Sequence, residues 1–286
     1  AGASISLMKM DEELKGLIDS KSDAPAFPVY GPVESIPYAD RCMKYEEHSE
    51  LADGITTDCR HAGMKADEIS LDNLIYLVDR MSACIIENEV PFCELDSHAG
   101  DGDFGMSVAK GFKQLKQEWK ELIENEARDI GTFLHGCSYI IMEHCGGASG
   151  PIWGSAFRAA GKSAGEKKAL TVTGFADMLQ AAVKGIQNTG ERSFGRGAVV
   201  GDKTLIDALV PCADAWTRCA EDGKSVAEAF AAGAQAAVEG AKATETVVAR
   251  MGRAGTVGER SLGYPDAGAY ALGVIFTELA DSVSIG

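Results

Sequence analysis

The sequence lacks any hydrophobic run of the roughly 20 residues that a membrane-spanning helix requires, and its start shows no charged-then-apolar leader. Basic residues are scarce as well. Against 43 aspartates and glutamates stand 27 lysines and arginines, a formal net charge of -16 among 286 residues. This charge repels phosphate backbones and anionic lipid headgroups, so neither nucleic acid nor a membrane surface is an expected partner. We expect a cytoplasmic protein in which any anionic ligand requires a local cation.

Patterns that mark several common catalytic and metal sites are also missing. The eight cysteines form no C-x-x-C pair, and the five histidines show no H-E-x-x-H spacing. These absences exclude a cysteine-rich zinc framework and a zincin. In a chain of this length, the scattered cysteines are typical of reduced thiols rather than of a disulfide scaffold.

Proline is concentrated in one stretch, since four of the eight prolines lie between Pro25 and Pro37. Fixed φ angles and missing N–H donors prevent a regular element there, so this stretch is predicted to be a linker. It follows a short strand-like run and one or two helical turns, a piece too small to bury its own core. We predict a tail and linker over residues 1–37, an irregular connector over 38–65, and one domain over 66–286.

Apolar residues recur at helical spacing through that domain, and no alternating strand pattern competes. The stripes that carry the signal lie near residues 71–85, 108–122, 130–145, 175–186, 205–216, 226–248 and 272–279. Ser70 is placed to cap the first helix and Pro151 to occupy the first position of the fourth. The pattern predicts an all-α fold, an eight-helix antiparallel barrel or bundle with its loops at two ends.

Helical periodicity does not account for the acidic segment LDSHAGDGDFGMS. Asp96, Asp101 and Asp103 place three carboxylates within eight residues, among glycines that let the backbone fold around them. Hard oxygen ligands on a turn suit magnesium or calcium, although the calcium-hand pattern does not fit. An acidic solvated loop is the plainer alternative.

A second loop, HCGGASGPIWG, joins a glycine-rich turn to the start of a helix. Backbone N–H groups and the positive end of a helix dipole would face an anion there, and Ser149 adds a hydroxyl donor. A flexible connection with an ordinary cap would look similar. Beside three carboxylates, a phosphate site is the better interpretation.

Two further segments are less specific. GDKTLIDALVPCADAW begins with a lysine, but the Walker frame and its preceding strand are absent, and Asp202 and Thr204 are interpreted as helix caps. The segment over residues 253–270 is a long loop carrying Arg253 and Arg260, the cations that an acidic protein would need near a polyphosphate.

Together these segments resemble the L domain, or nucleotide-binding subunit, of the dihydroxyacetone kinases. The resemblance covers about residues 66–286 and rests on four motifs in the same order, GDGDFG, GGASGPIWG, GDKTLIDALVP and GERSLGYPDAGA. It implies an eight-helix barrel that holds ATP or ADP at one end, with two Mg²⁺ ions bound by three aspartates. The implied reaction is phosphoryl transfer from ATP to the terminal hydroxyl of a short ketose such as dihydroxyacetone.

The resemblance also assigns roles to residues. Metal binding falls to Asp96, Asp101 and Asp103, which would act in catalysis through the metal. Nucleotide binding falls to Phe104, Gly105, Met106, Ser107, Gly147, Ala148, Ser149, Gly150, Leu205, Arg253, Asp266, Ala267 and Gly268. In this assignment Leu205 flanks the adenine, and Arg253 helps to close the site.

Two positions depart from the family pattern, and one part of the family's machinery is not recognised. Phe104 and Tyr264 stand where the family usually has histidine or, at the first position, a small or polar residue. The histidine that binds the ketose belongs to the family's K domain, so a K domain or subunit is the implied partner, and a homo-oligomer through K is expected. Residues 1–28 are similar to the tail of a K domain.

Alternatives remain at this point. The chain could be an L subunit whose tightly held ADP is recharged by a phosphotransferase-system protein, although the K-like tail argues against this. It could also be a non-catalytic nucleotide-binding regulator, which the substitutions at Phe104 and Tyr264 leave open. Fatty-acid kinases share a GDGD-type loop, but the second and fourth motifs favour the ketose kinases.

Overall fold

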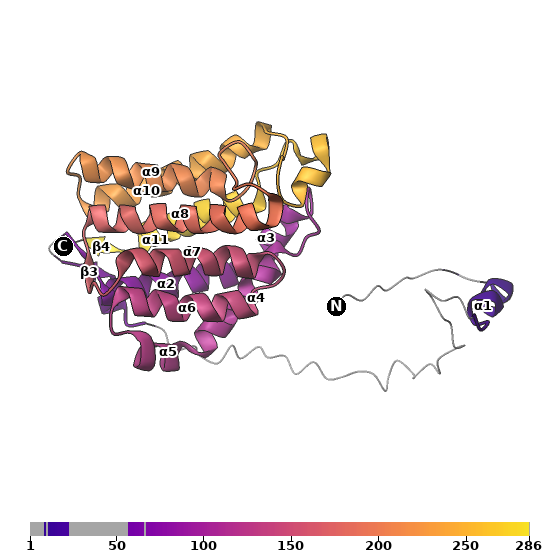
Figure 1. The fold of residues 1–286 in the computed structure, drawn as a ribbon, viewed down its shortest axis with the longest axis horizontal. Coiled ribbons are helices and arrows are strands. Elements are labelled where there is room, and N and C mark those ends of the chain that lie inside the picture. Colours follow the sequence, from indigo (N-terminus) through magenta and orange to yellow (C-terminus); the bar gives the residue numbers. More distant parts are fainter. Residues whose placement is uncertain (1–8, 10, 23–56, 66, 286) are drawn as a thin grey trace. The chain divides into compact units, whose positions relative to one another are not determined.

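A computed structural model of the chain describes residues 9, 11–22, 57–65 and 67–285 (Figure 1). The chain divides into two compact units, residues 1–51 and 52–286. In the first unit, the described helix α1 (Glu12–Ile18) is capped by Asp11, whose side chain accepts a hydrogen bond from the Leu14 N–H at 2.8 Å. It confirms the predicted helical turns. The strand-like run, apart from Lys9, and the proline-rich linker lie outside the described residues.

The second unit is built from helices. They are α2 (Leu71–Glu87), α3 (Glu89–Asp96), α4 (Phe104–Gln117), α5 (Trp119–Glu126), α6 (Ile130–His144), α7 (Ser149–Ala164), α8 (Val172–Phe194), α9 (Ile206–Glu221), α10 (Val226–Ala243) and α11 (Ala267–Ser282). Helices α2, α4, α6, α7, α8, α9, α10 and α11 pack each against the next, and α11 packs back against α2. Successive members run antiparallel. The predicted all-α, eight-helix barrel is confirmed.

Short strands close one end of this barrel. Strand β1 (Gly63–Met64) pairs in parallel with β4 (Ser284–Ile285), and β2 (Ile69–Ser70) pairs antiparallel with β3 (Ala169–Leu170). The loops that carry the four sequence motifs lie at the other end, beside α3 on the right of Figure 1. The fold therefore separates a closing end from a loop end.

Apolar side chains fill the ring between these ends. A cavity of about 120 Å³ inside it is lined only by apolar residues, among them Met81, Leu134, Trp153 and Phe276. Because no polar group lines this cavity, the barrel interior offers no site for a nucleotide phosphate or a divalent ion. Polar chemistry must lie at an end or on the outside.

The helix boundaries differ from the predicted ones in four places. Helix α3 was not predicted, because its eight residues carry a proline and no clear apolar stripe. The stripe over 108–122 is divided between α4 and α5 at Glu118, and α10 ends at Ala243, where the Thr244 hydroxyl donates to the Ala241 carbonyl. Helix α7 begins two residues before Pro151, which is tolerated because N–H groups throughout the first turn lack helical partners.

Part of the predicted connector packs onto the helical unit. The Thr57 N–H donates to Asp79 Oδ2 at 3.1 Å, and Asp79 also forms an ion pair with Lys116. With the β1–β4 pairing, these contacts tie residues 57–64 to the barrel. The domain boundary at residue 66 stays a prediction.

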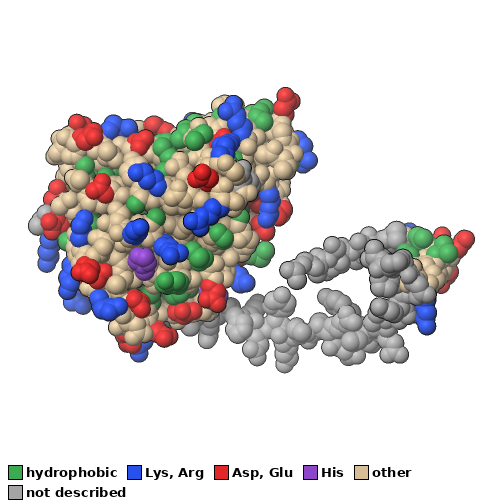
Figure 2. All heavy atoms as spheres, in the orientation of Figure 1, with side chains coloured by type: hydrophobic (Ala, Val, Ile, Leu, Met, Phe, Trp, Pro, Cys, Tyr) green, Lys and Arg blue, Asp and Glu red, His purple; other side chains and the backbone are tan. Residues whose placement is uncertain are grey.

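The surface charges, the cysteines and the helices can be compared with what the composition predicted. Acidic and basic side chains are interspersed over the face seen in Figure 2, without one large patch of either sign. Of the seven cysteines that the structure describes, none forms a disulfide, and the buried ones are Cys84, Cys137, Cys145, Cys212 and Cys219. None of the described helices combines the length and apolarity that crossing a bilayer would need.

Candidate functional site

The three motif aspartates converge at the loop end of the barrel. Asp96 is the last residue of α3, Asp103 immediately precedes α4, and Asp101 lies in the turn between these helices. Their carboxylates each offer an oxygen, and the three oxygens lie within 4.8 Å of one another. An all-oxygen, anionic donor set of this spacing suits a hard divalent cation such as Mg²⁺.

Asp96 also binds the backbone of the turn, a contact that the sequence analysis did not predict. Its Oδ2 accepts hydrogen bonds from the N–H groups of Gly102 at 2.9 Å, Asp103 at 3.1 Å and Phe104 at 3.4 Å. It thus caps the start of α4, whose own N-cap residue makes no side-chain cap hydrogen bond. One carboxylate therefore both fixes the turn and contributes to the cluster.

Two glycines permit this turn. Gly102 has a φ of +74°, a conformation that glycine adopts at little cost. A Cβ on Gly105 would lie 2.0 Å from the Glu89 carbonyl oxygen, so only glycine lets α4 approach α3 this closely. The GDGDFG motif is therefore needed for the backbone as well as for the carboxylates.

Arg253 reaches the aspartates from the long loop between α10 and α11. Its guanidinium forms an ion pair with Asp101 and lies 3.5 Å from Asp103. All three side chains are about half exposed. The Arg253 guanidinium is thus the local cation that we expected in an acidic protein, and it lies beside the carboxylates.

The loop before α7 lies against the start of α4. The Gly146 N–H donates to the Ser107 carbonyl at 2.9 Å, and a Cβ on Gly147 would lie 3.8 Å from the Arg253 guanidinium. Ser149 is the first residue of α7, and no side chain caps that helix. The N-termini of α4 and α7 are therefore near the aspartates, and both present a positive dipole end.

A fourth group of predicted residues lies at the starts of α9 and α11. A Cβ on Gly268 would lie 3.1 Å from Leu205 Cβ, which places these two predicted residues in contact. Asp266 caps α11 by accepting from the Ala269 N–H at 2.8 Å. Burial, reinforced by the charge of Asp207, raises the pKa of Asp266 to about 7.

Two of the predicted residues point elsewhere. The Phe104 ring packs on Phe92, with centroids 6.2 Å apart, and Phe104 lies against the barrel core. Met106 has an exposed side chain, and its N–H donates to Cys93 Sγ at 3.2 Å. The Phe104 N–H already donates to Asp96 Oδ2, so at both positions the backbone N–H has a partner within the chain.

Comparisons with known proteins agree with the motifs. The DAK2 domain matches residues 98–281. The L-erythrulose kinase of Pectobacterium atrosepticum is 31% identical over 279 residues, which is 96% of this chain and 44% of that kinase. The ADP-binding subunit DhaL of the PEP-dependent dihydroxyacetone kinase of Escherichia coli is 31% identical over 65% of this chain and 84% of that subunit. The chain belongs to the DAK2 domain family.

The likeness to solved structures concerns the fold. The dihydroxyacetone kinase from C. freundii in complex with AMP-PNP and Mg²⁺ aligns with 96% of this chain and 42% of that one, at 22% identity and a TM-score of 0.54. The predicted resemblance to the L domain of dihydroxyacetone kinases is confirmed. The chain spans less than half the length of the first curated relatives that it matches.

One contact across the DAK2 site could not be predicted. The rings of His98 and Tyr264 stack with centroids 3.7 Å apart and planes 5° from parallel. His98 lies two residues after Asp96, and Tyr264 lies in the long loop. Tyr264, which departs from the family pattern, thus joins two site loops that are distant in sequence.

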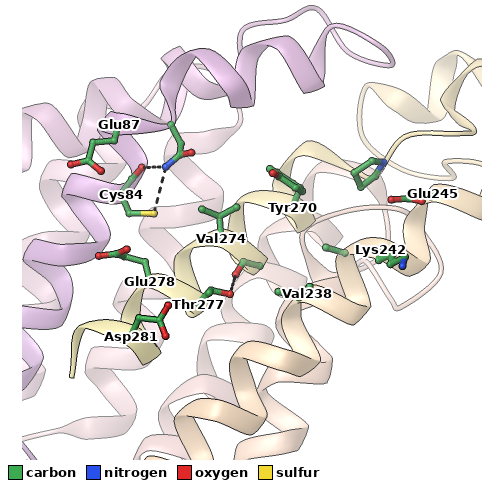
Figure 3. Close-up of a pocket in the computed structure, with 14 residues that line it drawn as sticks. Cys84, Glu87, Val238, Lys242, Glu245, Tyr270, Val274, Thr277, Glu278 and Asp281 are labelled. Atoms are coloured by element: carbon green, nitrogen blue, oxygen red, sulfur yellow. Dashed lines mark hydrogen bonds between the residues drawn. The ribbon is translucent and has the colours of Figure 1, made fainter. Parts of the chain in front are cut away.

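A groove of about 480 Å³ lies on the outside of the barrel between α2, α10 and α11 (Figure 3). Glu87, Glu278 and Asp281 border it, and Val238 and Val274 also line it. Glu278 forms an ion pair with Arg80. None of the predicted site residues lines this groove, so it is separate from the aspartate cluster.

Proposed function

We propose that this chain supplies the Mg-ATP site of a kinase that phosphorylates a short ketose. The observation that carries the proposal is the meeting of three carboxylates, Arg253 and two helix N-termini at one end of the barrel. Membership of the DAK2 family supports it, as do the names of relatives that phosphorylate erythrulose or dihydroxyacetone.

Different residues of the site would bind the metal ions and the phosphates of the nucleotide. Asp96, Asp101 and Asp103 would hold Mg²⁺, two ions in our proposal, which would neutralise the phosphates. Backbone N–H groups at the start of α7, the N–H of Gly105 in the first turn of α4 and the hydroxyl of Ser149 would bind phosphate oxygens. On nucleotide binding, Arg253 would leave the aspartates and bind a phosphate, because a planar guanidinium pairs with carboxylate and phosphate alike.

The remaining predicted residues would hold the nucleoside. Leu205 and Gly268 would offer an apolar surface to the adenine, and residues 266–268 would close the site beside it. Nothing in this arrangement forms a covalent bond to the substrate. Positioning and charge neutralisation, the two main contributions to phosphoryl transfer, are what the arrangement can provide.

The acceptor would be held by a K-type domain or subunit. The erythrulose kinase of P. atrosepticum aligns with 96% of this chain, but the E. coli DhaL subunit aligns with only 65%. Part of the chain therefore has its counterpart in the longer kinase and not in the DhaL subunit. This favours the ATP-dependent reading over an ADP carrier recharged by a phosphotransferase-system protein.

Metal removal tests the proposal. Calorimetry should detect ATP binding in the presence of Mg²⁺ and none in EDTA, because ATP and the aspartates repel one another without a metal ion. Asp103→Ala should lose Mg-dependent binding, and Asp222→Ala, at the far end of α9, serves as the matched control. Equal binding in EDTA, or by Asp103→Ala, would contradict the proposed site.

A further inference from the structure

Buried polar side chains gather beneath the candidate site. Nine polar side chains are buried in the part of the chain that the structure describes. Five of them belong to the loop before α9, to the first turn of α9 or to the segment between α10 and α11: Asp202, Lys203, Asp207, Thr244 and Ser261. This concentration requires an explanation, because burying a polar group costs free energy unless its hydrogen bonds are satisfied.

Lys203 lies at the centre of this group. Its Nζ donates to the carbonyl oxygens of Thr244 and Tyr264, each at 2.8 Å, and to that of Ser261. The ammonium group has three N–H bonds, so each has a carbonyl acceptor. Only 2% of the residue is exposed. One side chain thus fixes three points that lie 41 to 61 residues further along the chain.

The local backbone is shaped for this contact. Lys203 has a φ of +62°, which is uncommon for a residue with a Cβ. Asp207 holds the turn by accepting from the N–H groups of Gly201 at 2.6 Å and Thr204 at 2.8 Å. A strained lysine conformation that its neighbours enforce indicates a specific requirement rather than a chance burial.

Other hydrogen bonds hold the same segment. The Arg250 N–H donates to the Asp202 carbonyl at 3.0 Å, and the Ala249 N–H donates to Ser261 Oγ at 3.0 Å. The Asp266 N–H donates to Thr244 Oγ1 at 2.8 Å. Residues 244–266 contain no α-helix, so their position depends on these bonds and on Lys203.

This segment carries the groups that contact the aspartate turn. Arg253 meets Asp101 and Asp103, and the Tyr264 ring stacks on His98. Tyr264 joins the two networks directly, because its carbonyl accepts from Lys203 and its ring contacts His98. A continuous path of contacts therefore links the buried lysine to the metal-site turn.

We propose that Lys203 is a positioning residue, which anchors residues 244–266 so that Arg253 and Tyr264 meet the aspartate turn. What the positioned groups bind rests on the function proposed above; the anchoring itself does not. Burial lowers the pKa of Lys203, and the charges of Asp266 and Glu245 oppose that effect. The role of Lys203 is to fix the geometry of the segment, since every described hydrogen bond of its Nζ goes to a backbone carbonyl.

Hydrogen exchange and calorimetry on the 286-residue chain test this anchor. Lys203→Met removes the three donors, and Lys203→Gln keeps two. Lys116→Met is the matched control, because Lys116 is also largely buried, but its partner is the carboxylate of Asp79 on α2 and it is no site residue. We expect both Lys203 variants to speed amide exchange at 249, 250 and 263 while the barrel helices stay protected. Mg-ATP binding should weaken by about tenfold or more.

The control separates positioning from general destabilisation. Lys116→Met should lower the melting temperature but leave exchange in 244–266 unchanged and Mg-ATP affinity within about twofold of the wild type. If Lys203→Met does not fold, Lys203→Gln decides by the same measurements. Unchanged exchange at 249, 250 and 263 in a folded Lys203 variant would overturn the anchor. Failure of the wild type to bind Mg-ATP would count against the proposed function instead, since the exchange result stands by itself.

Discussion

The three aspartates of the site are not equivalent. Asp96 spends one carboxylate oxygen on three backbone N–H groups, whereas Asp101 and Asp103 face Arg253. Loss of Asp96 would therefore disturb the backbone of the turn as well as the charge. Asp101 and Asp103 are the better positions for testing metal binding separately from folding.

Arg253 offers a prediction about competition. Arg253→Gln frees two carboxylates, so Mg²⁺ affinity without nucleotide should rise, by at most about fivefold because exposed ion pairs contribute roughly 0 to 1 kcal/mol. Mg-ATP affinity should fall by about 1.5 to 3 kcal/mol, the contribution of a hydrogen bond to a charged group. Calorimetry with Mg²⁺ alone and then with Mg-ATP measures both. Changes in the same direction would show that Arg253 does not alternate between carboxylate and phosphate.

Asp266 offers a prediction about pH. Its pKa is about 7 in the folded chain and 3.8 in the reference state, so folding favours the protonated form. The resulting stability is present below about pH 4 and is lost as the pH rises to 7. Asp266→Asn keeps a good helix cap without the charge. Urea unfolding in EDTA should show the stability of the variant rising relative to that of the wild type between pH 4 and pH 8, and a difference independent of pH would contradict the raised pKa of Asp266.

At this scale the sequence predicted residue types better than their contacts. Three aspartates on a glycine-rich turn carry their chemistry in their spacing, and the structure brings them together. Lys203 and the stacked rings of His98 and Tyr264 could not be found in this way. Their partners lie dozens of residues away, and no local pattern records which loops a fold will bring into contact.

Two helices, α4 and α7, contribute their N-terminal ends to the site. Helices α4 and α7 start without side-chain caps from their own N-cap residues, and both starts lie at the loop end of the barrel. Apolar periodicity predicted α4, because core burial imposes a regular pattern, whereas α7 was predicted from Pro151 as a helix start. It did not predict α3, which is eight residues long and has only Phe92 buried. Short helices held by neighbouring loops leave little trace in the pattern.

Helix α7 offers a test of phosphate binding at a helix start. Ser149→Ala should weaken Mg-ATP binding by about 1.5 to 3 kcal/mol, because it removes one hydrogen bond to a charged oxygen. Ser155→Ala is the control, since its hydroxyl donates to the Ile152 carbonyl within the same helix. Calorimetry of both variants decides. Equal losses would indicate a general effect on α7, and no loss in Ser149→Ala would remove the hydroxyl from the site.

The helical unit combines an apolar barrel with a polar loop end. A ring of eight helices packs around an apolar interior, and helical residues supply nearly all of that interior. Segments of four separate loops meet at one end, where the carboxylates and Arg253 lie. This separation of fold from site lets the loops hold strained or charged groups. Helical periodicity predicted the ring, whereas the meeting of the four loops followed only from resemblance.

The last prediction concerns the division of labour between this chain and a partner. We expect the chain to bind Mg-ATP and to show little ketone-dependent ADP release, because the proposed site would hold a nucleotide and its described residues include no group suited to hold a small ketone. Proximity and orientation can contribute about 7 to 11 kcal/mol to such a transfer. A K-type domain added in trans should therefore raise turnover of dihydroxyacetone or erythrulose by orders of magnitude. A coupled assay for ADP release measures this, with Asp103→Ala as the control that should stay inactive in the mixture. Ketone-dependent turnover by the chain alone, equal to that of the mixture, would place the acceptor site within these 286 residues and refute the division.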